Sequence, residues 1–126
     1  MKRLFTLLFI LIASTISKAQ VVINEYSCSN LNSYPDNYGD YEDWIELYNA
    51  GGTAVNLQGY WLSDDPADIQ KYQIPAGVTI NPGARRMVFC SDRNTFSGGN
   101  VHTSFKLKQT RGEKFVFADP AGNILD

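Results

Sequence analysis

Histidine is nearly absent from this chain of 126 residues, and cysteine is scarce. The one histidine is His102, and the two cysteines are Cys28 and Cys90. A zinc site needs three or four His, Cys or carboxylate ligands, so these residues are a poor start for one. A serine hydrolase needs its histidine beside a nucleophile, and although Thr103 and Ser104 follow His102, no Gly-x-Ser-x-Gly turn is present. We therefore predict a domain that is not an enzyme and has no catalytic residues.

Basic residues are missing from the first half of the chain after its N-terminal segment. From Gln20 to Gln70 there are nine acidic residues and no basic one, whereas from Lys71 onward there are eight basic and four acidic residues. We expect the two halves to attract each other. A nucleic-acid binder carries a basic face, so this balance argues against nucleic acid as a partner of the domain.

Long hydrophobic runs are also missing. Residues 4–12 are apolar apart from one threonine, which is well short of the ~18 residues that span a membrane. A short basic start precedes this run, and Ser17 and Ala19 stand at the −3 and −1 positions of a cleavage site before Gln20. This pattern predicts a signal peptide over residues 1–19. We expect an exported protein, secreted or at the cell surface or in the periplasm, with no membrane span after cleavage.

Helical periodicity is absent after Gln20, and short strand-like runs take its place. Gly, Pro and Asn turns separate these runs at intervals of roughly ten residues, which favours an all-β sandwich or barrel. We expect about seven strands. The runs that read as strands are residues 21–26, 43–49, 54–57, 59–63, 71–74, 78–80, 85–90, 101–107 and 113–118, and residues 91–99 read as a polar loop.

The densest strand signal is residues 43–49, Asp-Trp-Ile-Glu-Leu-Tyr-Asn. Alternation places Ile45 and Leu47 on one face and Trp44 and Glu46 on the other. Both faces carry apolar bulk, as in the central strand of a sandwich. Glu46 needs polar partners or water, because an isolated buried carboxylate is costly. We expect two tryptophans that are at least half buried and a core that includes Ile23, Ile45, Leu47, Leu57, Leu62, Val88 and Phe117.

Several motifs, taken in order, resemble the lamin tail domain family, and in particular its secreted bacterial members. They are Val22-Ile23-Asn24-Glu25, Asp43-Trp44-Ile45-Glu46-Leu47-Tyr48-Asn49, Val55-Asn56-Leu57-Gln58-Gly59-Tyr60-Trp61-Leu62-Ser63-Asp64, Ile74-Pro75-Ala76-Gly77-Val78-Thr79-Ile80-Asn81-Pro82-Gly83 and Phe89-Cys90-Ser91-Asp92. The resemblance implies an immunoglobulin-like antiparallel β-sandwich over residues 20–126. It also implies a non-catalytic binding or interaction module, part of a larger secreted or cell-surface protein.

The resemblance leaves an alternative function open. Family members continue past the turn at residues 119–123 with a complete strand and at least one more element, so we expect the domain to be truncated at its C-terminus. In the alternative, the chain is an accessory domain of an extracellular hydrolase, a nuclease or phosphatase, whose catalytic part lies beyond residue 126.

Acidic residues gather in and beside the long loop that precedes the central strand. Glu25, Asp36, Asp40 and Asp43 supply the oxygen ligands that Ca²⁺ prefers, and an exported protein meets calcium outside the cell. Their spacing is not that of an EF-hand loop. The sequence therefore leaves two interpretations of this cluster, a calcium site and a solvated acidic loop.

The same loop carries three tyrosines, Tyr34, Tyr38 and Tyr41. Tyrosine rings can stack on sugars, and tyrosine is favoured at protein interfaces because it brings a large area at a low entropy cost. A carbohydrate or protein ligand is therefore expected for the module, unless these rings only pack the loop onto the sandwich.

An even number of cysteines permits one disulfide in an exported protein. The alternative is that Cys28 and Cys90 are two separate buried thiols, since free cysteine behaves as a small apolar residue.

Overall fold

Every regular element in the described part of the chain is a strand. The computed structural model describes residues 20–109 and 113–126, and no helix occurs among them. The ten strands are β1 (Val21–Ser27), β2 (Trp44–Asn49), β3 (Val55–Asn56), β4 (Trp61–Ser63), β5 (Tyr72–Gln73), β6 (Thr79–Ile80), β7 (Arg85–Phe89), β8 (Thr95–Ser97), β9 (Asn100–His102) and β10 (Val116–Ala118). The all-β prediction is confirmed, whereas the predicted signal peptide at 1–19 lies outside the described residues.

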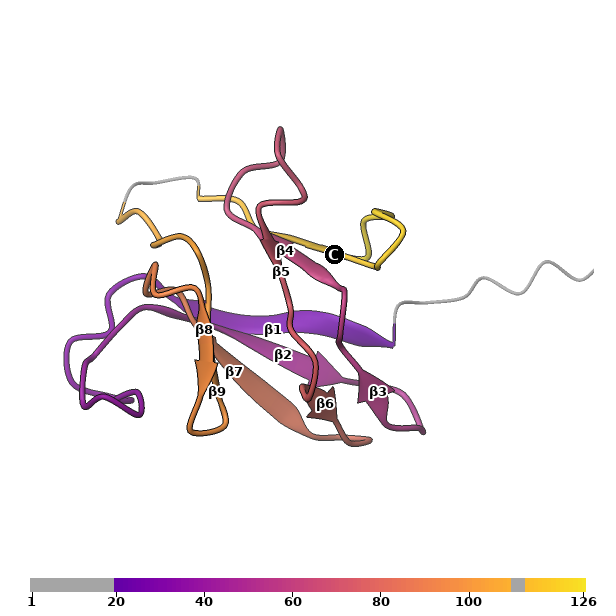
Figure 1. Cartoon of the computed structure of the whole chain (residues 1–126), viewed down its shortest axis with the longest axis horizontal. Coiled ribbons are helices and arrows are strands. Elements are labelled where there is room, and N and C mark those ends of the chain that lie inside the picture. The colour runs from indigo at the N-terminus through magenta and orange to yellow at the C-terminus, as the bar shows by residue number, and fades with distance from the viewer. Residues whose placement is uncertain (1–19, 110–112) are drawn as a thin grey trace, which may run out of the picture.

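One layer of the fold is a five-stranded sheet in the order β1-β2-β7-β9-β8 (Figure 1). β2 pairs with β1 on one side and with β7 on the other, both antiparallel, as expected for the central strand. β9, however, runs parallel to β7, which corrects the prediction of a purely antiparallel sandwich. The reason is the β8–β9 hairpin, which turns at Gly98 and Gly99, both at positive φ. After β7 the chain skips the position beside it and forms β8 at the sheet edge. It then turns back and forms β9 between β8 and β7, running parallel to β7.

The second layer is built from β10, β4 and β5, with the β3–β6 pair as an extension. Two backbone hydrogen bonds connect the β3–β6 pair to the β4–β5 pair: Leu57 N–H donates to Val78 O at 2.8 Å, and Gly59 N–H donates to Ile74 O at 2.9 Å. Residues 55–63 and 72–80 therefore run side by side as one irregular antiparallel ribbon. Each predicted strand in this layer is shortened, because turns interrupt the regular pairing.

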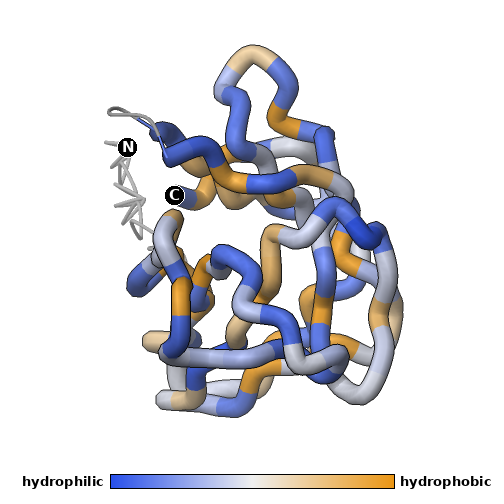
Figure 2. The backbone as a smooth tube through the Cα atoms, turned by 90° about the vertical axis from the view of Figure 1, so that its left-hand side faces the viewer, coloured by the Kyte–Doolittle hydropathy of each residue, from blue (hydrophilic) through white to orange (hydrophobic). Residues whose placement is uncertain are grey.

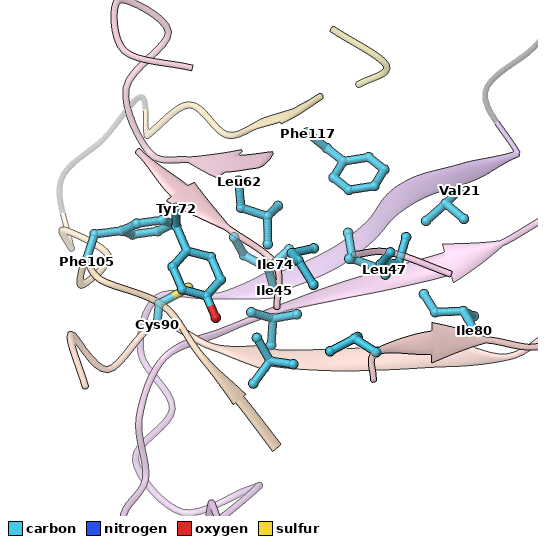
Figure 3. Packing of buried hydrophobic residues seen from close by; sticks show 14 of the residues in the cluster. Val21, Ile45, Leu47, Leu62, Tyr72, Ile74, Ile80, Cys90, Phe105 and Phe117 are labelled. Carbon is cyan, nitrogen blue, oxygen red and sulfur yellow. The ribbon is translucent and has the colours of Figure 1, made fainter. Parts of the chain in front are cut away.

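The core lies between the two layers (Figure 3). Short hydrophobic stretches alternate with hydrophilic ones along the backbone (Figure 2). Six of the seven predicted core residues are buried, and Trp44 and Trp61 are buried and partly buried, as predicted. Ile23 is only partly buried. It lies on the edge strand β1, next to a β-bulge between Ile23 and Glu25, where the second layer gives it less cover.

Ion pairs join the acidic first half to the basic second half, as the charge distribution predicts. Glu46 Oε1 lies 3.2 Å from Arg85 Nε and also accepts a hydrogen bond from the side-chain amide of Asn24 at 2.7 Å. The strand carboxylate thus has the polar partners that its place between aromatic residues requires. The other pairs of this kind are Lys71 with Asp64, Arg93 with Asp40 and Lys106 with Glu42.

Candidate functional site

The loop between β1 and β2, residues 28–43, lies against the outer face of the five-stranded sheet, and we name it the tyrosine loop. The buried side chain of Asn30 holds the loop together from inside. The Asn30 amide donates to the carbonyls of Tyr34 at 2.7 Å and Glu42 at 2.9 Å. The Asn30 backbone N–H donates to Asp43 Oδ1 at 3.1 Å. These contacts tie both ends of the loop together, so the sequence's polar composition here gives an ordered structure.

The tip of the tyrosine loop is a tight turn built around Asp36. Its Oδ1 accepts hydrogen bonds from the backbone N–H groups of Tyr38 at 2.8 Å and Asp40 at 2.9 Å. Its own N–H donates to Asp40 O at 2.8 Å. Gly39, at φ 84°, supplies the left-handed residue that closes the turn. The aspartate thus satisfies the backbone of the turn with one carboxylate oxygen and leaves the other free to face the sheet.

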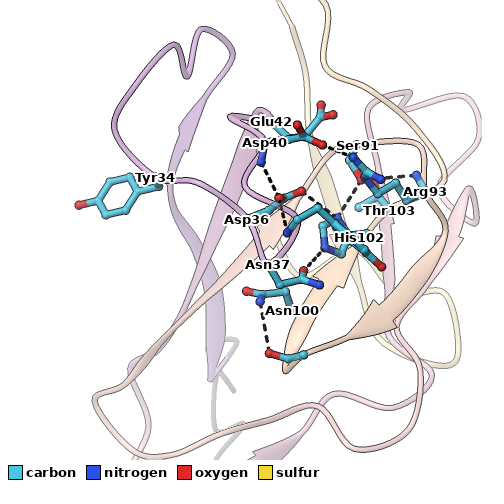
Figure 4. A network of polar contacts seen from close by, with 12 residues as sticks. Tyr34, Asp36, Asn37, Asp40, Glu42, Ser91, Arg93, Asn100, His102 and Thr103 are labelled. Atoms are coloured by element: carbon cyan, nitrogen blue, oxygen red, sulfur yellow. Dashed lines mark hydrogen bonds and ion pairs between the residues drawn. The ribbon is translucent and has the colours of Figure 1, made fainter.

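His102 of β9 connects this turn to the sheet (Figure 4). The imidazole is fully buried, with its Nε2 2.8 Å from Asn37 Oδ1 and its Nδ1 2.9 Å from Ser91 Oγ. Because an amide oxygen only accepts, Nε2 carries the hydrogen and Nδ1 accepts from the Ser91 hydroxyl. Burial lowers the pKa of His102, and the nearby Asp36 carboxylate offsets part of that shift. The ring is therefore neutral near pH 7.

The serine, histidine and aspartate in this cluster do not form a hydrolase triad. The carboxylate of Asp36 lies 3.9 Å from Nδ1, the nitrogen that Ser91 already uses, whereas a triad acid orients the opposite nitrogen. Ser91 and His102 are buried, which leaves the hydroxyl out of reach of a substrate. Ser104, two residues after His102, instead donates to the carbonyl of Lys71 at 3.1 Å. The cluster of Asp36, Asn37, Ser91 and His102 has a structural role, and we name it the latch.

The outer surface of the loop presents three tyrosines and a leucine. Tyr34, Tyr38, Tyr41 and Leu31 are 52%, 49%, 47% and 76% exposed. Tyr34 packs edge-on against the buried Trp44, with ring centroids 5.8 Å apart, and Figure 4 shows its ring pointing away from the latch. The loop thus packs on the sandwich and still leaves about half of each tyrosine open to solvent.

Tyr38 is held from two sides. The guanidinium carbon of Arg93 lies 4.4 Å from the Tyr38 ring centroid, and the His102 ring meets it edge-on at 5.4 Å. Arg93 also pairs with Asp40 in the same loop. The residues on either side of Arg93, Asp92 at φ 61° and Asn94 at φ 49°, adopt the left-handed conformation. With this backbone the Arg93 side chain reaches Tyr38 and Asp40 of the loop.

The predicted calcium ligands are only partly brought together. Asp36 and Asp40 share the turn, Asp43 is hydrogen-bonded to Asn30, and Glu25 stays exposed on β1. Within residues 20–109 and 113–126, no group of three or more His, Cys, Asp or Glu side chains is arranged to hold a metal ion. The structure assigns no ligand set to these four residues.

Comparison with known proteins identifies a family. The sequence model of a family described as Lamin Tail Domain matches residues 14–126. No curated protein matches the chain. The part of the chain that the structure describes contains no helix long and apolar enough to cross a membrane.

Proposed function

The chain belongs to the lamin tail domain family, and from that premise we propose that it is a non-catalytic binding module of an exported protein. Its immunoglobulin-like β-sandwich serves as a rigid support, and its motifs resemble those of the secreted bacterial members. The predicted signal peptide supports export. We propose that the tyrosine loop is the binding surface, within a larger secreted or cell-surface protein.

The observation that carries this proposal is the pairing of exposure with order in one loop. Tyr34 and Tyr41 are about half exposed, while Asn30 and Asp36 fix the backbone between and beside them. A surface that is ordered before it meets its ligand loses little conformational entropy on binding. Tyrosines on such a surface add a large contact area with few rotatable bonds.

We favour a protein over a carbohydrate as the ligand. Leu31 is the most exposed residue among the apolar side chains of this surface, at 76%. An aliphatic side chain beside tyrosines suits the apolar centre of a protein interface, whereas sugar stacking uses the aromatic rings alone. In the accessory-domain alternative the same surface would hold a hydrolase close to its substrate, so one experiment addresses both.

The test uses the fluorescently labelled domain, residues 20–126, and intact cells of the organism that produces it. We expect saturable binding that is lost when the cells are treated with protease. The double variant Leu31→Ala/Tyr41→Ala should bind at least about ten-fold more weakly, as loss of two interface side chains implies. Tyr34 and Tyr38 are left in place because Tyr34 packs on Trp44 and Tyr38 packs on Arg93 and His102.

The matched control is Ile124→Ala, which removes an exposed apolar side chain outside the loop. It should bind like the wild type. Equal binding by the double variant would contradict the proposed surface. Binding that survives protease but is competed by soluble polysaccharides would replace the protein ligand with a carbohydrate.

A further inference from the structure

His102 joins the tyrosine loop to the sheet through contacts of its buried ring, which the proposed function does not use. Its Nε2–H donates to Asn37 of the loop at 2.8 Å, and its Nδ1 accepts from the Ser91 hydroxyl at 2.9 Å. Asp36 Oδ2, 3.9 Å from Nδ1, is buried and has no hydrogen-bond partner within the described residues. Buried carboxylate oxygens without partners are rare in folded proteins. Here the orphan oxygen faces the one ring nitrogen that can take up a proton.

We propose that protonation of His102 releases the tyrosine loop from the sheet, so that the domain holds this surface in place near neutral pH and frees it in acid. Release of the loop from the sheet is independent of the proposed binding function. Only the expectation that release alters ligand binding rests on that function. The measurements described below detect release without any ligand, so the two proposals can fail separately.

The closed latch is built around a neutral ring. A proton on Nδ1 turns that nitrogen into a donor, and the Ser91 hydroxyl, which can also accept, would have to reverse its hydrogen bond. The charged ring would also lie without solvent contact, stacked on Phe89 at 5.5 Å and edge-on to Tyr38 at 5.4 Å. Burying an isolated charge in such a place is costly. An open loop would let water solvate the imidazolium.

Asp36 is the group that could stabilise the charge in place, and its own contacts oppose this. Its Oδ1 is held by the backbone N–H groups of Tyr38 and Asp40. Moving the carboxylate from 3.9 Å to hydrogen-bond distance of Nδ1 would stretch those two bonds, which shape the turn. The aspartate therefore attracts the proton without pairing with it.

The other charged groups around the ring come from both sides of the latch. They are Asp40 and Glu42 on the loop, and Arg93 and Lys106 on the sheet side, joined as the pairs Arg93–Asp40 and Lys106–Glu42. Arg93 lowers the pKa of His102 and Glu42 raises it, after the larger effects of burial, which lowers it, and Asp36, which raises it. The net direction is a pKa below the ordinary 6.5. The closed loop is then fully stable above about pH 7 and loses stability as the pH falls through about 6.5, because the open state binds the proton more tightly.

The first measurement follows the ring protons of His102 by NMR from pH 8 to 4.5 in the presence of EDTA. Because the chain has one histidine, the assignment is unambiguous. We expect a titration midpoint below about 6.5. In Asp36→Asn, which keeps an acceptor for the turn but loses the charge, the midpoint should fall further. A wild-type midpoint above 6.5 would mean that Asp36 captures the proton in place and acid tightens the loop, which would overturn the proposal.

The second measurement uses Trp44, which is 6% exposed beneath Tyr34, as a reporter of release. In a Trp61→Phe background, the acrylamide quenching constant of Trp44 should rise at least about two-fold between pH 7.5 and pH 5, with an unchanged far-UV circular dichroism spectrum. With His102→Gln added, the constant should be the same at both pH values. Equal quenching at both pH values in the reporter protein, or the same rise with His102→Gln, would overturn the proposal. If the His102→Gln protein does not fold, the ring titration decides.

Discussion

The side-chain amide of Asn49 on β2 donates a hydrogen bond to the carbonyl of Ile80 on β6, 3.0 Å away, and so ties the two layers of the sandwich together. The same amide nitrogen donates to Thr53 O at 2.8 Å, and Asn49 Oδ1 accepts from Gly51 N–H at 2.9 Å. The side chain is fully buried. One asparagine thus closes the β2–β3 turn and fixes where the second layer begins.

Asn49→Ala should destabilise the domain by about 2–4 kcal/mol, because it removes three hydrogen bonds and takes away the side-chain donor of the buried contact to the Ile80 carbonyl. The matched control is Asn56→Ala, whose exposed side chain accepts a single bond from Gln58 N–H at 3.0 Å. It should cost less than about 1 kcal/mol. Urea unfolding followed by tryptophan fluorescence measures both, and equal losses would contradict the role given to Asn49.

The central strand was predictable because its residues act locally. Alternation placed Ile45 and Leu47 together, and both are fully buried in the core. It also placed Trp44 on the outer face, where the tyrosine loop buries it to 6% exposure. The demand of Glu46 for partners followed from the cost of a buried carboxylate, and Asn24 and Arg85 meet it.

The β8–β9 hairpin was not predictable in the same way. Residues 95–97 are too short and polar to stand out as a strand, and they lie at the sheet edge, where little apolar burial is required. The expected strand over 101–107 is instead β9, which ends at His102. The latch depends on this hairpin, because it brings Ser91 and His102 together. Proximity in the sequence points to Ser104 as the partner of His102, whereas the hairpin supplies Ser91.

Phe117→Ala should cost about 3–5 kcal/mol of unfolding free energy. Phe117 of β10 is fully buried and stacks on Tyr60 with ring centroids 5.4 Å apart. Phe96→Ala is the control, since that ring is 36% exposed on the edge strand β8, and it should cost less than half as much. Guanidinium unfolding of the three proteins gives the comparison, and a cost for Phe117→Ala no larger than that for Phe96→Ala would contradict the assigned core.

The two cysteines should differ in reactivity. Both are free thiols in the described structure, Cys28 partly buried and Cys90 fully buried. Burial raises the pKa of the Cys90 thiol, which keeps it protonated and unreactive at pH 8. We expect a disulfide-exchange reagent to label Cys28 faster than Cys90 in the folded protein and both residues at once in guanidinium. A protein that shows no reactive thiol even when unfolded would instead contain the disulfide.

The export prediction concerns residues 1–19, which precede the described domain. We expect the protein recovered outside the cytoplasm to begin at Gln20, because Ser17 and Ala19 form the cleavage motif before it. Intact-mass spectrometry of the exported protein provides the test. Substitution of Ala19 by a bulky charged residue should block cleavage, while an exported protein that retains Met1 would contradict the signal peptide.

We propose that the tyrosine loop is an ordered surface before any ligand binds. Hydrogen exchange of the Tyr38 and Asp40 amides tests it most directly, because both N–H groups donate to Asp36 Oδ1, at 2.8 and 2.9 Å. At pH 7.5, where His102 is neutral, we expect both amides to exchange at least about 100-fold more slowly than in an unstructured peptide. Exchange within about ten-fold of the peptide rate would show a loop that is open in solution, and the tyrosine loop would then not be a preformed surface.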